Sequence, residues 1–406
     1  MAESPDDADD ARSRLRWLVV GVLVLSTALS FVDRQVLAAL APVLQEQFNL
    51  SNFGYAWVVS AFSLTYAVFA PAAGLLVDRV GLNVGISAAV ALWSMAGVAT
   101  GFAGGLGSLL TCRAALGAAE SAGIPATAKG FALYLKPRER AMGTALNQVG
   151  ITIGMMAAPL LVGWLAAAYG WRAAFVATGV AGLAWIPLWW LTVRRIPVPP
   201  PTGSPNGART LARDWRLWAL AVANVLMMTV YSLWMNWTTI FLVSAHGLSM
   251  KDANWRFAWI PPVFASLGGL SGGWLSMRWA RAGRGLYAAR LRVCVIGGVA
   301  LTTTALVPWV PGAALATALI SVSFFMAVAM SANIYAMPLD LFGARRSAFA
   351  VSVLTGSYGL MQAVASPIFG WLIDRFGFGA VCGLCGALPL VSVAVLALVG
   401  RSRRTE

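Results

Sequence analysis

Two carboxyl groups stand out because they lie inside long apolar stretches. Asp33 and Glu120 fall deep in such stretches, whereas the other acidic residues lie near the N-terminus, in loops, at the ends of apolar stretches or in the tail. A charged side chain at bilayer depth costs about 2.5–3.5 kcal/mol or more, so each is a functional candidate. The sole histidine, His246, is expected in an external loop. If protons drive the function, Asp33 and Glu120 are therefore the predicted carriers.

Arg34, Arg113 and Lys129 are the basic residues at similar depth. A guanidinium group binds a carboxylate through two parallel hydrogen bonds, so Arg34 is the predicted anion-binding residue. The alternative is a fixed Asp33–Arg34 ion pair that only stabilises packing. Arg113 precedes Glu120 by seven residues, which places both on one helix face about 10 Å apart. We assign Arg113 to proton coupling, with a gate or packing pair as the alternative, and Lys129 could equally snorkel to the cytoplasmic end.

The second half of the chain offers neutral polar and aromatic side chains instead. No acidic or basic residue lies between positions 217 and 245, or between 293 and 339. Charge on one half and neutral groups on the other suit a polyhydroxylated monoanion, although aromatic residues often only fill space between helices. Besides Arg34, the predicted substrate-binding residues are Tyr66, Gln148, Tyr231, Trp234, Trp237, Ser357 and Tyr358.

The composition requires a membrane to hold these side chains in place. The chain of 406 residues is 59% hydrophobic and 11% charged, whereas a soluble domain has about 25% charged residues. Its apolar runs are continuous rather than alternating, which predicts membrane-spanning helices and excludes a barrel. No motif typical of a soluble enzyme is present, and no catalytic residue, metal site or cofactor is predicted. Cys382 and Cys385 are interpreted as small core residues.

The runs and their breaks predict an all-α membrane protein of twelve transmembrane helices. A Pro- and Gly-rich linker at 194–213 separates an N-terminal six-helix bundle, 15–193, from a C-terminal one, 214–400. Short tails, 1–14 and 401–406, complete the chain. The predicted helices are 15–42, 53–77, 83–104, 106–133, 139–168, 171–193, 214–245, 253–279, 286–308, 311–340, 346–373 and 377–400.

The basic residues predict the orientation. The net charge is +14, but the arginines form short clusters between apolar runs, which is typical of cytoplasmic anchoring and not of nucleic-acid binding. The predicted external loops hold only Arg172, Lys251, Arg256 and Arg375. We therefore expect both termini in the cytoplasm and a multi-pass protein of the bacterial inner (plasma) membrane, partnered by the lipid bilayer and present as a monomer.

One pattern recurs along the chain, and its three full copies each follow a proline. It spans Gly74–Gly81, Gly163–Gly170 and Gly370–Gly377, and a shortened copy lies at 273–278. Each copy is predicted to end the second helix of a three-helix group, on alternating sides of the membrane. Inverted three-helix repeats produce such alternation.

The first copy resembles the cytoplasmic signature of the major facilitator superfamily. Its residues Gly74, Asp78, Arg79 and Gly81 form the predicted gate motif. The basic residues that usually follow are replaced by Leu82 and Asn83, which weakens the expected charge contacts of that gate. A second signature of the family is the segment Arg113–Gly117. The resemblance implies the major facilitator fold, with two bundles of inverted repeats.

Further segments resemble the anion:cation symporters, a branch that imports hexuronates, galactonate and similar acids. These segments are Val32-Asp33-Arg34, Gly117–Pro125, Pro137–Arg140, Phe257–Pro261 and Asp340–Gly343. The resemblance implies proton-coupled symport and points to Arg34 as the anion-binding residue.

We therefore expect a secondary active transporter that carries a small sugar-acid anion, such as a hexuronate or aldonate, by alternating access. The proton is its only expected coupling ion. The alternatives are an importer of aromatic or short-chain carboxylates, suggested by the deep tryptophans, and a proton-coupled drug exporter. A deep, positively charged site disfavours the exporter. No enzymatic activity is expected.

Overall fold

A computed structural model describes residues 5–135, 139–194, 211–283, 285–342 and 344–402 of the chain. Within these ranges the secondary structure is helical, and no strand is present. Nine helices of the described part are long and apolar enough to cross a membrane. The all-helical prediction is confirmed, and the count of twelve spans stays a prediction.

The chain forms two compact units. Unit 1 comprises residues 1–37 and 64–203, and unit 2 comprises residues 38–63 and 204–406. The unit boundaries fall within helix α1 (Pro5–Phe48) and helix α2 (Asn52–Val80). Helix α1 begins inside the predicted tail, and residues 195–210 of the predicted linker lie outside the described residues. The division into two six-helix bundles stays a prediction.

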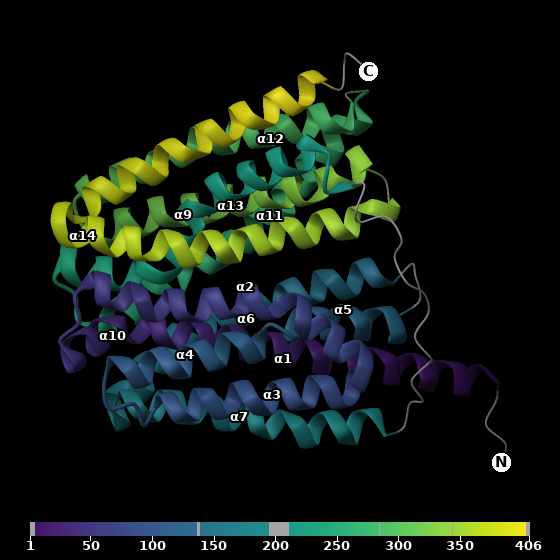
Figure 1. The fold of residues 1–406 in the computed structure, drawn as a ribbon, viewed down its shortest axis with the longest axis horizontal. Helices are drawn as coiled ribbons and strands as arrows, with labels where there is room; N and C mark the ends of the chain where they lie inside the picture. The colour runs from purple at the N-terminus through teal and green to yellow at the C-terminus, as the bar shows by residue number, and fades with distance from the viewer. Residues whose placement is uncertain (1–4, 136–138, 195–210, 284, 343, 403–406) are drawn as a thin grey trace. The chain divides into compact units, whose positions relative to one another are not determined.

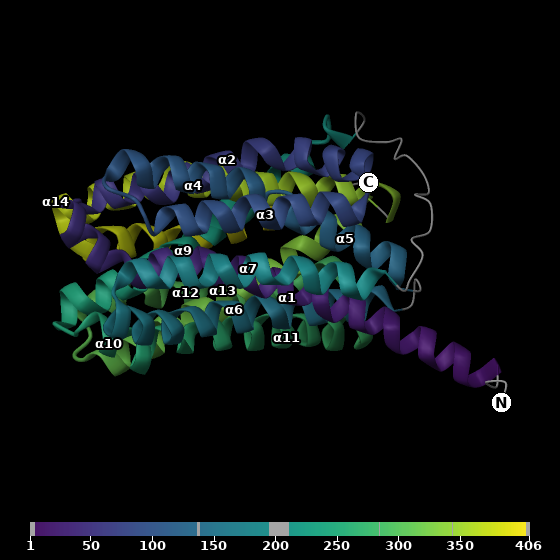
Figure 2. The ribbon, with the colours of Figure 1, turned by 90° about the horizontal axis from the view of Figure 1, so that it is seen from below.

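Unit 1 contains most of α1 and the second half of α2, followed by five further helices. Gly182 allows α3 and α7 to pack closely, because a Cβ atom there would lie 2.1 Å from the Ser94 hydroxyl oxygen. These two helices lie side by side in the views of Figure 1 and Figure 2. The five helices are α3 (Leu82–Thr100), α4 (Leu106–Glu120), α5 (Gly123–Tyr134), α6 (Arg140–Tyr169) and α7 (Trp171–Val193).

The single helix expected over 106–133 is interrupted directly after Glu120. Helix α4 ends there and α5 begins at Gly123. Pro125 explains the break, since it has no backbone N–H to donate to the carbonyl group of Ser121. The Ala122 N–H instead reaches the Ala119 carbonyl, at 3.4 Å, a three-residue bond that tightens the turn. The interruption places Glu120, a candidate functional residue, at the C-terminal end of α4.

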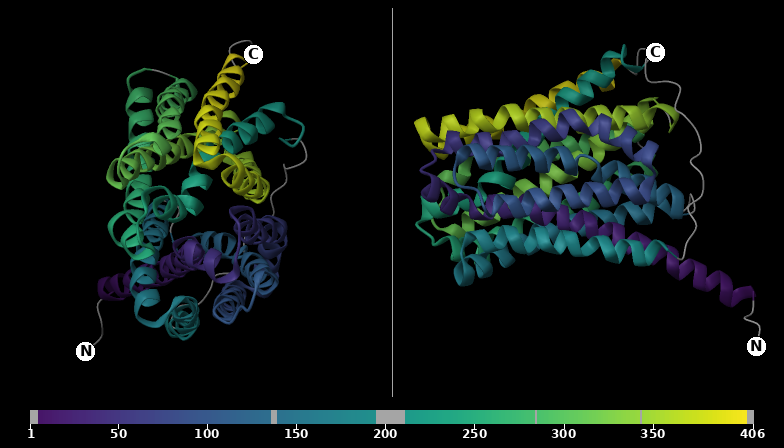
Figure 3. Two further views of the ribbon diagram at one scale, coloured as in Figure 1. Left: turned by 90° about the vertical axis from the view of Figure 1, so that its left-hand side faces the viewer. Right: turned by 60° about the horizontal axis from the view of Figure 1, so that its bottom comes forward.

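Unit 2 contains the remaining helices, and close packing at glycine recurs there. A Cβ atom on Gly268 of α11 would lie 2.0 Å from the Phe325 carbonyl oxygen of α13, so only glycine fits. Helix α9 packs along α14 and α11 along α13, and Figure 3 views them end-on and from the side. The helices are α9 (Trp215–His246), α10 (Met250–Ala253), a π-helix (Asn254–Ala258), α11 (Ile260–Arg281), α12 (Leu286–Leu301), a 3-10 helix (Thr302–Trp309), α13 (Ala313–Phe342) and α14 (Ala344–Ser402).

The last glycine of each full repeat copy lies where one helix gives way to the next. Gly81, Gly170 and Gly377 have positive φ values of 86°, 84° and 73°. Glycine adopts this left-handed backbone without a Cβ penalty. At Gly377 the two arms of α14 meet in a kink. The prediction that each full copy ends a helix is confirmed.

In the copy that ends at Gly377, Asp374 caps the start of α2. Its Oδ1 accepts hydrogen bonds from the Asn52 backbone N–H, at 3.0 Å, and from the Asn52 side-chain amide, at 2.8 Å. Its Oδ2 accepts from the Phe53 backbone N–H, at 2.8 Å. A carboxylate at a helix N-terminus satisfies backbone donors that have no helical partner, and it is favoured by the helix dipole.

Replacing Asp374 with Ala should free the N–H groups at the start of α2. A lost N-terminal cap costs about 1 kcal/mol, so amide hydrogen exchange at residues 52–54 should accelerate about fivefold. Arg375→Ala is the matched control, because its guanidinium group lies 5.8 Å from the ring centroids of Trp371 and Phe376. Equal exchange in both variants would show that the cap does not stabilise this helix end.

Candidate functional site

Arg34 and Glu120 form an ion pair inside unit 1. The Arg34 Nε donates a hydrogen bond of 2.6 Å to the Glu120 Oε2. The Arg34 side chain is 17% exposed and that of Glu120 is 0% exposed. The second carboxylate oxygen of Glu120 accepts no hydrogen bond from the described residues. Arg34 is therefore the member of the pair that an incoming anion can reach.

Two aromatic rings hold the Arg34 guanidinium group. Its carbon atom lies 4.8 Å from the Phe31 ring centroid and 4.8 Å from the Tyr66 ring centroid. Phe31 precedes Arg34 by three residues, so both lie on one face of α1. A guanidinium group next to aromatic faces gains a cation–π interaction and keeps a fixed orientation. Such an arrangement presents its planar N–H groups in one direction.

Asp33 is buried beside the same cluster without a hydrogen-bond donor. Asp33 is 4% exposed, and neither of its carboxylate oxygens accepts a hydrogen bond from the described residues. Glu120 and Arg113 are the charged groups close enough to influence it, and the Thr178 side chain of α7 lies nearby. A buried carboxyl group in such surroundings is suited to exchange a proton.

Close helix packing positions these side chains. On α6, a Cβ atom at Gly154 would lie 2.3 Å from the Ala28 carbonyl oxygen and 3.0 Å from the Phe31 Cβ, so the glycine lets α6 approach α1. The Thr65 hydroxyl donates to the Ala114 carbonyl at 2.8 Å and joins α2 to α4. Tyr66 and Arg113 are the direct neighbours of these two residues. Backbone contacts thus fix the helices that carry the cluster.

The cluster balances its charges. Two carboxyl groups, Asp33 and Glu120, accompany two guanidinium groups, Arg34 and Arg113, all of them in unit 1. With every group ionised the sum is zero. A bound monoanion would leave one excess negative charge, and one bound proton would restore neutrality. A bound anion and a bound proton would therefore offset each other in the total charge of the cluster.

The neutral candidates of the second half lie in unit 2. Trp234 and Trp237 are fully buried there, and their rings pack edge-on against Phe241 and Tyr55. Tyr231 packs against Phe324, and the Ser357 hydroxyl donates to the Leu354 carbonyl at 2.8 Å. Tyr358 is half-buried. Their roles as substrate contacts stay predictions.

The remaining candidates of unit 1 have varied surroundings. Gln148 is exposed on α6. The Lys129 Nζ donates to the Val77 carbonyl at 3.0 Å, so this lysine binds the last turns of α2. In the gate motif Gly81 forms a turn and Arg79 is exposed, whereas the side chain of Asp78 lies outside the described part.

Sequence reasoning omitted Phe31 and Thr178. The three-residue spacing between Phe31 and Arg34 could have identified the first, because residues so spaced share a helix face. Thr178 lies 145 positions from Asp33 and carries no local signal. Among the described residues, no cluster of three His, Cys, Asp or Glu side chains could hold a metal ion.

Comparison with known proteins places this chain in a transporter family. The model of the Major Facilitator Superfamily matches residues 23–336. A hexuronate transporter of Escherichia coli is 28% identical over 94% of this chain and 93% of its own. A galacturonate transporter of Dickeya chrysanthemi is 31% identical over 65% of this chain and 82% of its own.

Solved structures support the fold. A bacterial homologue of the human lysosomal transporter Spinster, in an inward-facing and occupied conformation, has a TM-score of 0.77 and 22% identity, covering 95% of this chain and 97% of its own. Sequence and fold agree, and the relatives are transporters rather than enzymes. The chain is similar to members of the family named as hexuronate transporters, and it belongs to the Major Facilitator Superfamily.

Proposed function

We propose that this protein imports a sugar-acid anion, such as a hexuronate or an aldonate, by proton-coupled symport. The observation that carries the proposal is the Arg34–Glu120 ion pair, in which the cation is partly exposed and the carboxylate is buried. The relatives named as hexuronate and galacturonate transporters support a sugar acid as the substrate class.

Substrate binding is an exchange of one carboxylate for another on Arg34. In the pair, Glu120 occupies the Nε of Arg34. A proton on Glu120 removes its negative charge and weakens the pair, because the attraction between two opposite charges is lost. The guanidinium group then binds the substrate carboxylate by donating two parallel N–H hydrogen bonds to its oxygen atoms. Proton and substrate thus bind together.

The charge balance of the cluster supports one proton for each monoanion. One substrate carboxylate adds one negative charge to a neutral set, and one proton on Glu120 or Asp33 offsets it. A buried uncompensated charge is costly, so the loaded cluster favours equal numbers of both.

Transport follows if the binding site of the loaded protein, first open to the outside, closes there and opens to the cytoplasm. In the proposed cycle, two six-helix bundles rock about the central site, and release of the proton to the cytoplasm lets Glu120 recapture Arg34 and expel the substrate. The proposed protein is a monomer of the bacterial inner membrane with both termini in the cytoplasm.

Other carboxylates draw less support. The argument for an aromatic acid rests on deep tryptophans, and Trp234 and Trp237 are fully buried against other aromatic rings. The drug-exporter alternative has no observation in its favour, since Arg34 is suited to anions.

The test is substrate-induced thermal stabilisation of the purified protein. The panel comprises hexuronates, aldonates, aldarates, aromatic and short-chain carboxylates, uncharged hexoses and a lipophilic cation. We expect one class of sugar acid to raise the melting temperature, more strongly at low pH, and the shift to disappear in Arg34→Ala. Stabilisation by the cation or by an uncharged hexose would overturn the substrate class and leave the family assignment standing.

A further inference from the structure

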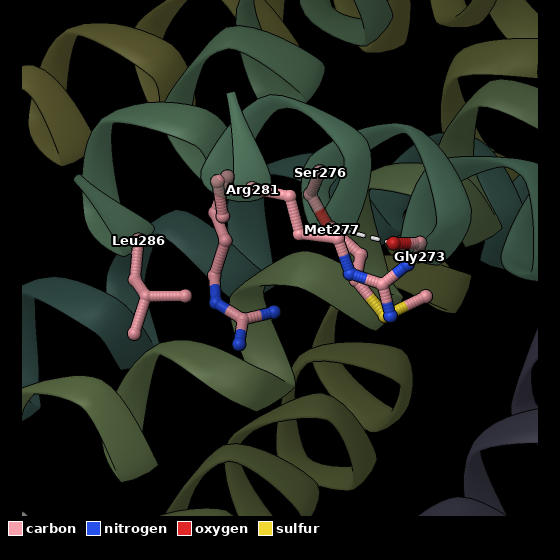
Figure 4. A pocket seen from close by; sticks show the side chains of 7 residues that line it. Gly273, Ser276, Met277, Arg281 and Leu286 are labelled. Atoms are coloured by element: carbon pink, nitrogen blue, oxygen red, sulfur yellow. Dashed lines mark hydrogen bonds between the residues drawn. The ribbon is translucent and has the colours of Figure 1, made fainter. Parts of the chain in front are cut away.

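A pocket of about 410 Å³ lies between the end of α11 and the start of α12, in unit 2. Gly273, Ser276, Met277, Ala280 and Arg281 line it from α11, and Leu286 and Arg290 line it from α12. Figure 4 shows these side chains around the pocket, with the hydrogen bond between Ser276 and Gly273. Its residues take no part in the Arg34–Glu120 cluster, so it calls for a separate explanation.

Among the described residues, the lining carries positive charge and no carboxyl group. Arg290 forms an ion pair with Asp340 of α13, through Nε–Oδ2 at 2.5 Å and an outer nitrogen to Oδ1 at 3.3 Å. Arg281 has no carboxylate partner among the described residues, and its hydrogen bond is a weak one to the Met277 sulfur at 3.8 Å. The Arg281 guanidinium group therefore remains able to bind an anion.

An exposed apolar stripe leads along α11 to this arginine. Leu270 is 70% exposed, Trp274 is 54% exposed and Met277 is 48% exposed. With Arg281 they are spaced by four, three and four residues, so all four lie on one face of the helix over about 16 Å. The opposite face carries Gly268 and packs against α13. The stripe is apolar along its length and ends at a cation.

We infer that this pocket binds the headgroup of an anionic phospholipid, whose acyl chain lies along the stripe. The Arg281 guanidinium would bind the phosphate oxygens, and Leu270, Trp274 and Met277 would contact the chain. A soluble phosphate compound shares the headgroup chemistry but gains nothing from the stripe, which is why the lipid is the assigned ligand. By the predicted orientation, this end of α11 faces the cytoplasmic leaflet, where basic pockets recruit anionic lipids. The inference does not depend on the transported substrate.

Native mass spectrometry of the purified protein tests this inference with dioleoyl phosphatidylglycerol, and with dioleoyl phosphatidylcholine as the neutral lipid. We expect phosphatidylglycerol to bind more tightly, and Arg281→Gln to weaken its binding about fivefold. Arg292→Gln is the matched control, because Arg292 is exposed near the same end of α12 and does not line the pocket. It should bind like the unaltered protein.

Two further comparisons sharpen the result. Glycerol 1-phosphate carries the same phosphate chemistry without acyl chains, and it should not bind at equal concentration. Dioctanoyl phosphatidylglycerol should bind more weakly than the dioleoyl lipid. The inference is overturned if phosphatidylglycerol and phosphatidylcholine bind equally, if both arginine variants lose binding equally, or if glycerol 1-phosphate binds as well as the lipid.

Discussion

Replacing Glu120 with Gln should abolish proton-driven accumulation of substrate and leave exchange of substrate across the membrane largely intact. The amide has the shape of a protonated carboxyl group, but it cannot release a proton. Arg34 then stays available to the substrate, because its Nε, which lies 2.6 Å from the Glu120 carboxylate, would face an uncharged amide and lose the attraction between opposite charges. The variant corresponds to a protein fixed in its proton-loaded form.

Reconstituted vesicles separate these two activities. With an imposed proton gradient, we expect uptake in Glu120→Gln to reach only the equilibrium level, a loss of up to about tenfold against the unaltered protein for one proton per cycle at a gradient of one pH unit. Counterflow of labelled substrate should continue. Substrate affinity should no longer fall as the pH rises, since the competing carboxylate is gone.

The matched control is Glu46→Gln, which makes the same chemical change on an exposed residue near the C-terminal end of α1. Its accumulation should equal that of the unaltered protein. Full accumulation by Glu120→Gln would contradict the assignment, and Asp33→Asn would then be the next variant to measure. Asp33 is the other buried carboxyl group of the cluster.

The sequence identified the charged residues of the cluster but not their pairing. Helical spacing linked Arg113 to Glu120, and adjacency linked Asp33 to Arg34. In the structure Glu120 accepts its hydrogen bond from Arg34, which is 86 positions away. Neighbours on a helix point about 100° apart, and residues seven apart are about 10 Å apart, so neither local relation is a contact. The pair depends on how α1 and α4 pack, which spacing does not specify.

Which tryptophans are buried within the protein was not predictable, for a different reason. In a membrane helix both the lipid-facing and the buried sides are apolar, so hydrophobic periodicity does not separate them. Trp234 and Trp237 are fully buried, whereas Trp218 on the same helix is exposed. By contrast, the repeated Gly-to-Gly interval predicted the helix ends at Gly81, Gly170 and Gly377, because a backbone with positive φ leaves a residue-type signal.

Replacing Arg34 with Lys should weaken substrate binding by roughly tenfold to a hundredfold, the effect of losing one hydrogen bond to a charged group. Lysine keeps the charge, so it can still pair with Glu120. It lacks the planar pair of N–H groups that binds both oxygens of a carboxylate. It also loses the fit to the rings of Phe31 and Tyr66, each centred 4.8 Å from the guanidinium carbon.

Arg113→Lys provides the comparison that makes this result specific. Arg113 is 4% exposed, so its charge acts on Asp33 from within the protein rather than on a ligand. The Arg113→Lys variant should alter the pH dependence of uptake into vesicles more than it alters substrate affinity. Isothermal titration at several pH values measures that affinity. Thermal unfolding without substrate checks that both variants fold. Near-normal affinity in Arg34→Lys with a large loss in Arg113→Lys would move the anion site to Arg113, because the guanidinium that requires its fork is the one that binds the carboxylate.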